Sequence, residues 1–251
     1  MLIAHDRMNC SQGENLAGLT GKVKDFVKKK GATLVGVAAI ERFSRAPKGH
    51  RPRDFLPNAE SVISIGLRIS KSSILHLPKT MREYKVNYDV ANLKLNSLAW
   101  ETARFLEDLG YEAIAIPASP PFDKKKNFGD MSHKHAAVAA GLGRFGMNNL
   151  VLTSDYGPYV RFVTVVTNAA LKPDRPLTED ICLLEKCLRC IKACPAGALE
   201  NPVYDASEGW LINKEKCHEY IHIVSGGEVC GLCIKACPIT KTQNSARALC
   251  M

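Results

Sequence analysis

The 251-residue sequence lacks the features that would place it in a membrane or outside the cell. It has no run of about 18 apolar residues, which excludes an ordinary transmembrane helix. Its first residues carry neither an apolar signal core nor a twin-arginine pair, so we expect a protein that is not exported. Low-complexity tracts are absent, and aromatic residues make up only 7%. These absences predict a globular, cytoplasmic protein with no membrane partner.

Cysteine, in contrast, is abundant and concentrated in one stretch. Two sub-runs repeat a C-x2-C-x3-C-P spacing, the first ending at Pro195 and the second at Pro238. This is the later part of the bacterial ferredoxin run, which binds iron–sulfur clusters through thiolates. Two [4Fe–4S] clusters need eight thiolates, and the stretch supplies eight. They are Cys182, Cys187, Cys190, Cys194, Cys217, Cys230, Cys233 and Cys237.

The repeat also predicts how the ligands are shared between the clusters. In ferredoxins the last cysteine of each run binds the cluster of the other run. The two cysteines outside the sub-runs, Cys182 and Cys217, complete the sets by inference. We therefore predict one cluster on Cys182, Cys187, Cys190 and Cys237, and the other on Cys194, Cys217, Cys230 and Cys233.

Two other uses of these cysteines stay open. C-x2-C pairs also build tetrahedral zinc sites, although zinc does not require the x3-Cys-Pro ending twice. A disulfide framework is typical of short secreted domains, which this chain does not resemble. The remaining cysteines, Cys10 and Cys250, are expected to be free thiols.

The formal net charge of +9 overstates how basic the protein is. Eight thiolates and two cationic cluster cores would leave a charge of about +5. We therefore expect nucleic acid to be an unlikely partner, despite a sequence pI of about 9.0.

The hydrophobic pattern predicts an α/β fold for the first two-thirds of the chain. A Pro-rich segment at residues 171–177 is the candidate boundary, which gives an α/β domain over residues 1–170 and a small α+β ferredoxin-like domain over residues 177–251. Helices are expected at 14–30, 87–109 and 133–140, and strands at 32–40, 61–69, 111–116, 150–153 and 159–167.

A glycine-rich segment follows the third expected helix. Gly141, Gly143 and Gly146 match the letters G-x-G-x-x-G, but the dinucleotide fingerprint needs a strand before it and a helix after it. We therefore do not expect NAD to bind here. What remains is backbone that can turn tightly or approach another group closely, beside the amide of Asn148.

Polar residues near this segment are the candidates for chemistry. His133 could supply a proton near neutral pH, although a structural histidine is the more common case. His133 and His135 do not share a helix face, so a joint metal site is not expected. Tyr156, Tyr159 and Arg161 gather near one turn, where either packing or ligand binding would suit them.

Three parts of the chain together resemble one known superfamily. RPRDFLPNAESVISIGL, GDMSHKHAAVAAGLGRFGMNNLVLTSDYGPYVRFVTVVTN and the double-cluster tail resemble the epoxyqueuosine reductases and reductive dehalogenases, over roughly residues 50 to 240. The resemblance implies a nitroreductase-like α/β domain that holds a cobalamin beside a ferredoxin-like domain. Electrons from a low-potential donor such as ferredoxin or flavodoxin would pass through both clusters to cobalt, which reduces a small organic substrate. Gly141, Gly143, Gly146, Asn148, Tyr156 and Arg161 would line the cofactor pocket.

Three departures from the superfamily pattern keep other functions open. His133 stands where the epoxyqueuosine reductases carry a proton-donating Asp, no tRNA-binding repeat follows the clusters, and no twin-arginine signal precedes them. A short branch with its own substrate is therefore the first prediction. A non-enzymatic electron carrier, or a reductive activator of a corrinoid protein, is the alternative. A tRNA-modifying enzyme is a third and weaker one.

Overall fold

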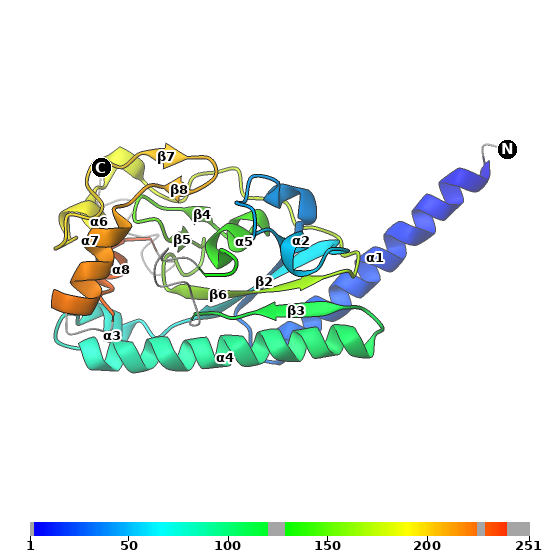
Figure 1. The fold of residues 1–251 in the computed structure, drawn as a ribbon, viewed down its shortest axis with the longest axis horizontal. Coiled ribbons are helices and arrows are strands. Elements are labelled where there is room, and N and C mark those ends of the chain that lie inside the picture. Colours follow the sequence, from blue (N-terminus) through cyan, green and yellow to red (C-terminus); the bar gives the residue numbers. More distant parts are fainter. Residues whose placement is uncertain (1–2, 120–128, 225–228, 240–251) are drawn as a thin grey trace.

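A computed structural model describes residues 3–119, 129–224 and 229–239, with side chains from residue 16 onward. Its centre is a four-stranded sheet in the order β1-β2-β6-β3, antiparallel throughout (Figure 1). The strands are β1 (Leu34–Ala39), β2 (Ser61–Arg68), β3 (Ala113–Ile116) and β6 (Val160–Thr167). The two central strands, β2 and β6, pair along eight residues, because both are nearly continuous runs of buried apolar and small residues.

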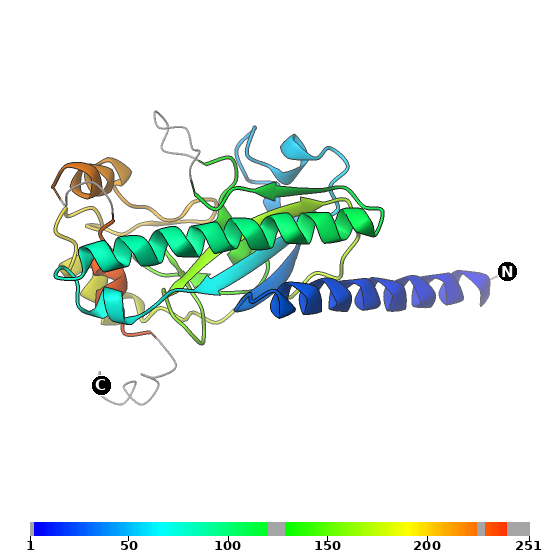
Figure 2. The ribbon, with the colours of Figure 1, turned by 90° about the horizontal axis from the view of Figure 1, so that it is seen from below.

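Helices cover both faces of this sheet. On one face lie α1 (Ile3–Lys29) and α4 (Met81–Asp108), the long helix in front of the sheet in Figure 2. Val27, Leu95 and Leu98 are fully buried there against Ile63 and Val163. On the other face lies α5 (His133–Ala139), through its small residues. The result is a three-layer mixed α/β fold, which confirms the predicted class at that level.

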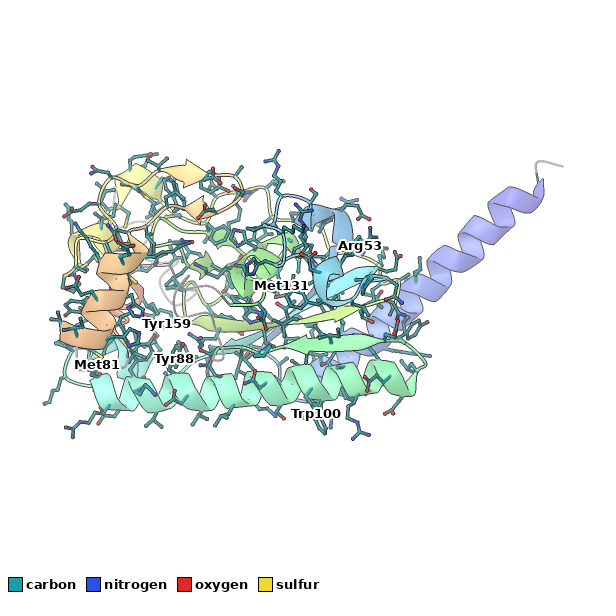
Figure 3. The ribbon with its side chains drawn as sticks, viewed as in Figure 1. Arg53, Met81, Tyr88, Trp100, Met131 and Tyr159 are labelled. Carbon is teal, nitrogen blue, oxygen red and sulfur yellow. The ribbon has the colours of Figure 1, made fainter. Side chains whose placement is uncertain are left out.

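The outer face of α4 is exposed. Trp100 points away from the sheet in Figure 3 and is 56% exposed, and its ring packs under the guanidinium of Arg104. The inner face carries the buried positions that the helical periodicity indicates. This difference between the two faces fixes the rotation of α4 and directs Tyr84 and Tyr88 inward.

The predicted helix ends are confirmed by their glycines. Gly31 follows α1 with φ of 101°, and Gly110 follows α4 with φ of 86°, both in the left-handed region that ends helices. Helix α4 begins six residues before the predicted start at Asn87, because the polar residues of its first turns hid the apolar period.

Short elements complete the sheet-bearing part. These are a 3-10 turn (Ile40–Phe43), α2 (Pro52–Phe55), α3 (Ser72–Leu75), β4 (Arg144–Phe145) and β5 (Val151–Leu152). The last two form a small hairpin beside α5. It carries the glycine-rich segment toward the cysteines.

The cysteine-rich part consists of single turns and short helices. They are a 3-10 turn (Leu184–Lys186), α6 (Arg189–Lys192), the hairpin of β7 (Tyr204–Asp205) and β8 (Gly209–Trp210), α7 (Lys214–Glu219), a π turn (Tyr220–Val224) and α8 (Leu232–Ala236). Few of its side chains are fully buried. So little apolar burial is expected of a part that needs bound metal for much of its stability.

The two parts share a core. Tyr84, Leu77 and Tyr159 from the sheet-bearing part pack with Val229 and Ile234 from the cysteine-rich part. Arg144 adds polar contacts by donating to the Leu177 carbonyl at 3.0 Å and pairing with Asp180 at 2.8 Å. The predicted division at residues 170–177 stays a prediction, as do the nitroreductase-like and ferredoxin-like descriptions. In the described ranges no helix is long and apolar enough to cross a membrane.

Candidate cluster sites and the adjoining pocket

The two cysteine sub-runs fold alike. The residue after the first cysteine adopts a left-handed conformation in both, Leu188 with φ of 49° and Gly231 with φ of 72°, and each precedes a short helix, α6 or α8. This turn aims the first two cysteines of a sub-run at a common point. Glycine is required at 231, because a Cβ there would lie 2.6 Å from the Tyr84 ring.

The described cysteines gather into two neighbourhoods. Cys182, Cys187, Cys190 and Cys237 line one small cavity, and the charges of Cys190 and Cys237 both interact with those of Cys182 and Cys187. Cys217 and Cys230 interact with Cys194, and Cys233 interacts with all three. Cys190 also contributes to the raised pKa of Cys233, so the two neighbourhoods adjoin. We call them the first set and the second set.

The two sets have the same members as the predicted ligand groups, so the residues present fit two four-thiolate clusters. Within the described ranges no three His, Cys, Asp or Glu side chains form a group that could hold a single metal ion. The ligand assignment stays a prediction, now with a geometric basis.

Burial favours the protonated form of several of these thiols when no metal is bound. It raises the pKa of Cys190 to about 11 and that of Cys237 to about 12, with the neighbouring cysteines adding to the rise. Burial also raises the pKa of Cys233 strongly. A metal must therefore displace these protons when it binds, so cluster assembly should release protons and weaken at low pH.

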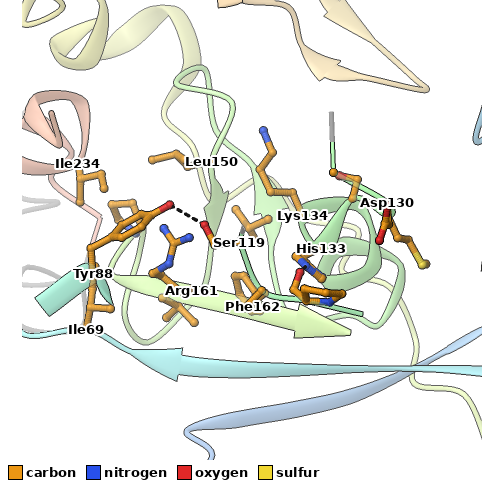
Figure 4. Close-up of a pocket in the computed structure, with 18 of the residues that line it drawn as sticks. Ile69, Tyr88, Ser119, Asp130, His133, Lys134, Leu150, Arg161, Phe162 and Ile234 are labelled. Atoms are coloured by element: carbon orange, nitrogen blue, oxygen red, sulfur yellow. Dashed lines mark hydrogen bonds between the residues drawn. The ribbon is translucent and has the colours of Figure 1, made fainter. Parts of the chain in front are cut away.

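A pocket of about 430 Å³ lies between the sheet and the cysteine-rich part (Figure 4). It has the volume of a small-molecule site. Its walls come from β6, α4, α5, α8 and the loops before α5. Apolar side chains include Ile69, Leu150, Val160, Phe162 and Ile234, and polar ones include Tyr88, Ser119, His133, Lys134 and Arg161.

One wall of the pocket is a phenol beside a guanidinium. The carbon at the centre of the Arg161 guanidinium lies 3.8 Å from the centre of the Tyr88 ring, and Arg161 Nε donates to Asn92 Oδ1 at 2.7 Å. The Tyr88 hydroxyl and Ser119 Oγ are hydrogen-bonded at 3.1 Å. Burial opposes ionisation of Tyr88, but the Arg161 charge and the hydrogen bonds outweigh it and lower the pKa of the phenol. The site would therefore stabilise the phenolate form of Tyr88.

The opposite wall adjoins the second set of cysteines. Ile234 lines the pocket and follows Cys233 directly in the chain. The buried Tyr84 ring also lines the pocket and touches the turn at Gly231. The pocket is therefore next to the second set, whereas the cavity of the first set is lined by Met147, Leu152 and other residues outside the pocket.

His133 is held on both sides of its ring. Nε2 donates to the Pro117 carbonyl at 2.7 Å, so Nδ1 must accept from Thr164 Oγ1, at 2.8 Å. Burial lowers the pKa of His133 to about 4, so the ring is neutral near pH 7. These contacts favour a role in fixing the loop before α5 against β6, rather than the proton-donating role that the sequence suggested.

The depressed pKa of His133 makes stability depend on pH. The folded protein binds this proton less well than the unfolded chain, so the contribution is complete above pH 6.5 and is lost as the pH falls toward 4. Between pH 7 and pH 5 the free energy of unfolding should fall about 2 kcal/mol further in the wild type than in His133→Gln, whose amide cannot titrate. Urea denaturation at both pH values measures this. An equal fall in the free energy of unfolding in the wild type and in His133→Gln would contradict the assignment.

The predicted glycines contact the protein itself. A Cβ on Gly141 would lie 2.3 Å from the Arg175 carbonyl oxygen, and one on Gly143 would lie 2.4 Å from that of Leu152. Gly146 packs against the Leu152 side chain. The expectation of close backbone approach is thus confirmed. The predicted contact with a cofactor is untested, and none of the three glycines lines the pocket.

The other residues predicted to line one cofactor pocket lie in different places. Arg161 lines the pocket, whereas Asn148 lines the cavity of the first cysteine set. Tyr156 lies outside the pocket, with its ring 5.7 Å from the Arg68 guanidinium. The sequence analysis missed Tyr88 and Lys134. Their only signals were the spacing of Tyr84 and Tyr88 by one helical turn, and a lysine enclosed by two histidines.

Comparison with known proteins gives two groups of relatives. A tetrachloroethene reductive dehalogenase of Sulfurospirillum multivorans is 26% identical over 266 residues, covering 89% of this chain and 50% of the relative. An epoxyqueuosine reductase of Bacillus subtilis (strain 168) is 27% identical over 217 residues, covering 77% of this chain and 50% of the relative. The chain thus spans about half the length of these relatives. No known protein-family model matches it.

Solved structures of the same two groups share the fold. An epoxyqueuosine reductase superposes with a TM-score of 0.59 at 19% identity, over 89% of this chain and 66% of that one. A catabolic reductive dehalogenase in complex with 3-bromo-4-hydroxybenzoic acid gives 0.67 at 19% identity, over 88% of this chain and 32% of that one. An epoxyqueuosine reductase with a tRNA stem loop gives 0.58 at the same identity, over 89% of this chain and 66% of that one.

Proposed function

We propose that this chain, whose relatives are the epoxyqueuosine reductases and the reductive dehalogenases, is an iron–sulfur oxidoreductase. The relatives confirm the superfamily resemblance and are themselves reductases. In the proposal, two [4Fe–4S] clusters carry electrons one at a time to an acceptor in the 430 Å³ pocket, where a small organic substrate is reduced.

The order of the two cysteine sets relative to the pocket is the observation that supports this most. The second set adjoins the pocket through Ile234 and Tyr84, whereas the first set lines a separate cavity that shares no residue with the pocket. Electrons from an external donor would enter at the first set and leave from the second. Such an order is what a relay needs and what two independent structural metal sites would not require.

The pocket residues supply the proton and the charges. Tyr88 would donate its phenolic proton to the reduced substrate, because Arg161 stacks on its ring and stabilises the phenolate. Arg161 and Lys134 are the cations that line the pocket, which favours a substrate or intermediate with negative charge.

Cobalamin is the acceptor that the family offers. One of the reductive dehalogenases that share this fold carries out B12-dependent dehalogenation. The described pocket can take one face of such a cofactor, but its volume of about 430 Å³ is smaller than the whole molecule. The described residues would therefore enclose a cobalamin only in part, and we derive no step through it.

A binding experiment separates the acceptor from the clusters. The anaerobically reconstituted protein should bind a corrinoid with one site per chain and give a base-off Co(II) signal in electron paramagnetic resonance (EPR). Absorbance and EPR titration with cobalamin measures both. If the clusters are intact but no corrinoid binds, cobalamin is not the acceptor, while the proposed electron relay through the clusters still stands.

Two alternatives to a reductase of small organic substrates can be compared with the structure. A non-enzymatic electron carrier, or an activator of a corrinoid protein, would need no substrate pocket, so the pocket beside the second set favours the enzyme. A tRNA substrate gains weight from the epoxyqueuosine reductase bound to a tRNA stem loop, against our expectation that nucleic acid is an unlikely partner. The exposed basic segment Arg42–Arg53 supports it, since His50 Nδ1 contacts the carbonyl of the pocket residue Asp130 at 2.9 Å.

A further inference from the structure

Lys134 lines the same pocket as Ile234, the residue that follows Cys233 of the second set. Lys134 is the second residue of α5, and Figure 4 shows it at the pocket edge, across from Ile234. Its Nζ donates to Asn149 O at 2.9 Å and to Asn149 Oδ1 at 3.2 Å. Nζ also lies 6.0 Å from the centre of the Phe145 ring. These contacts fix a buried ammonium group in one place.

The charge of this ammonium group lacks a carboxylate partner in the part of the chain that the structure describes. Its hydrogen bonds go to neutral amide oxygens, which do not balance a charge. The thiolate forms of Cys217 and Cys233, both of the second set, would attract it, while Lys214 repels it. Burial lowers the pKa of Lys134 to about 8, as expected of a cation without a counter-charge.

A four-thiolate cluster would supply that counter-charge. Four thiolates around a cubane core of charge +2 carry a net charge of −2, and reduction by one electron makes it −3. A fixed cation beside the cluster stabilises the reduced form more than the oxidised form. Lys186, Arg189 and Lys192, which lie close in sequence to the cysteines of the first set, are exposed.

We propose that Lys134 raises the reduction potential of the second-set cluster, so that electrons flow from the first set toward the pocket. This inference rests on the proposed function and adds a direction to the relay. Lys134 acts through the cluster and is a positioning charge, not a group that reacts with substrate.

Removing the charge should change the equilibrium of one cluster alone. In Lys134→Gln, the ratio of reduced to oxidised second-set cluster at a fixed potential should fall about tenfold, which is a shift of about 59 mV for one electron. The first-set cluster should keep its midpoint. EPR-monitored potentiometric titration of the full chain with both clusters measures the two midpoints separately.

Three further variants make the result specific. Lys134→Arg keeps the charge and should keep the midpoint. Asn149→Asp places a carboxylate on the present partner of Lys134 and should lower the midpoint of the same cluster, and an aspartate tolerates the left-handed backbone at φ of 53°. Lys94→Gln removes an exposed lysine from the outer part of α4 and should change neither cluster.

The outcomes distinguish this inference from the function on which it rests. If Lys134→Gln loses iron, the midpoint potentials of the second-set cluster in Asn149→Asp and Lys134→Arg test the role of Lys134 instead. Full iron content with unchanged midpoints in Lys134→Gln or in Asn149→Asp overturns the role of Lys134 and leaves the relay intact. A wild-type protein that binds no iron overturns both.

Discussion

Replacing Cys217 by serine should lower the bound iron from about eight atoms per chain to about four. Cys217 lies on α7, whose first turn is fixed by the Asn213 side chain accepting from Lys216 N at 2.9 Å. It interacts electrostatically with Cys194, Cys230 and Cys233, so its loss leaves the second set with three thiolates. The first-set cluster should remain, while reduction of any acceptor in the pocket stops. Iron and sulfide analysis of anaerobic protein measures the change.

A three-iron centre in Cys217→Ser would also support the predicted ligand set, since three thiolates can retain a partial cluster. Its EPR signal in the oxidised state would identify it. The matched control is Cys10→Ser, which removes a cysteine that we predict to be a free thiol and should leave iron unchanged. Eight iron atoms in Cys217→Ser would show that this cysteine is not a ligand.

Replacing Gly157 by alanine should destabilise the protein and remove the first-set cluster. A Cβ at this position would lie 1.6 Å from the Ile239 carbonyl oxygen, and the residue has φ of 52°. Ile239 follows Cys237 and Pro238, so the clash displaces the segment that brings Cys237 to the first set. Strain and overpacking together should cost roughly 3 kcal/mol or more. Thermal unfolding and iron content measure the two effects.

Gly110→Ala separates the clash from the backbone strain. Gly110 also has a left-handed backbone, with φ of 86°, but an added Cβ would meet nothing within 4 Å. It should cost only about 1 kcal/mol, the penalty for the left-handed conformation, and keep all of the iron. If Gly157→Ala also cost only about 1 kcal/mol and kept all of its iron, Ile239 would not be packed against the 153–157 turn as the structure shows.

The sequence predicted most of the sheet and the grouping of cysteines because both depend on short-range patterns. Strands β1, β2 and β6 are continuous apolar runs, and each lies within two residues of its predicted bounds. The sub-runs place their cysteines through local turns, the ferredoxin pattern supplies the crossing of Cys194 and Cys237, and Cys182 and Cys217 join the sets by inference. Gly31 and Gly110 end their helices through their own conformational freedom.

The pocket could not be predicted in the same way, because its residues come from distant parts of the chain. Tyr88 and Arg161 are 73 positions apart in the sequence, yet their side chains stack. Lys134 and Ile234 are 100 positions apart in the sequence, yet both line the pocket. The neighbour of the glycine-rich segment could not be inferred from its sequence, because close backbone approach is the same requirement whether the neighbour is a ligand or the chain itself.

The decisive measurement is the metal content of protein purified without oxygen. Such protein should be brown, hold about eight iron and eight sulfide atoms per chain, and give the EPR signals of two cubanes on reduction. A colourless protein that holds zinc in place of iron would contradict it, because zinc cannot carry electrons to the pocket.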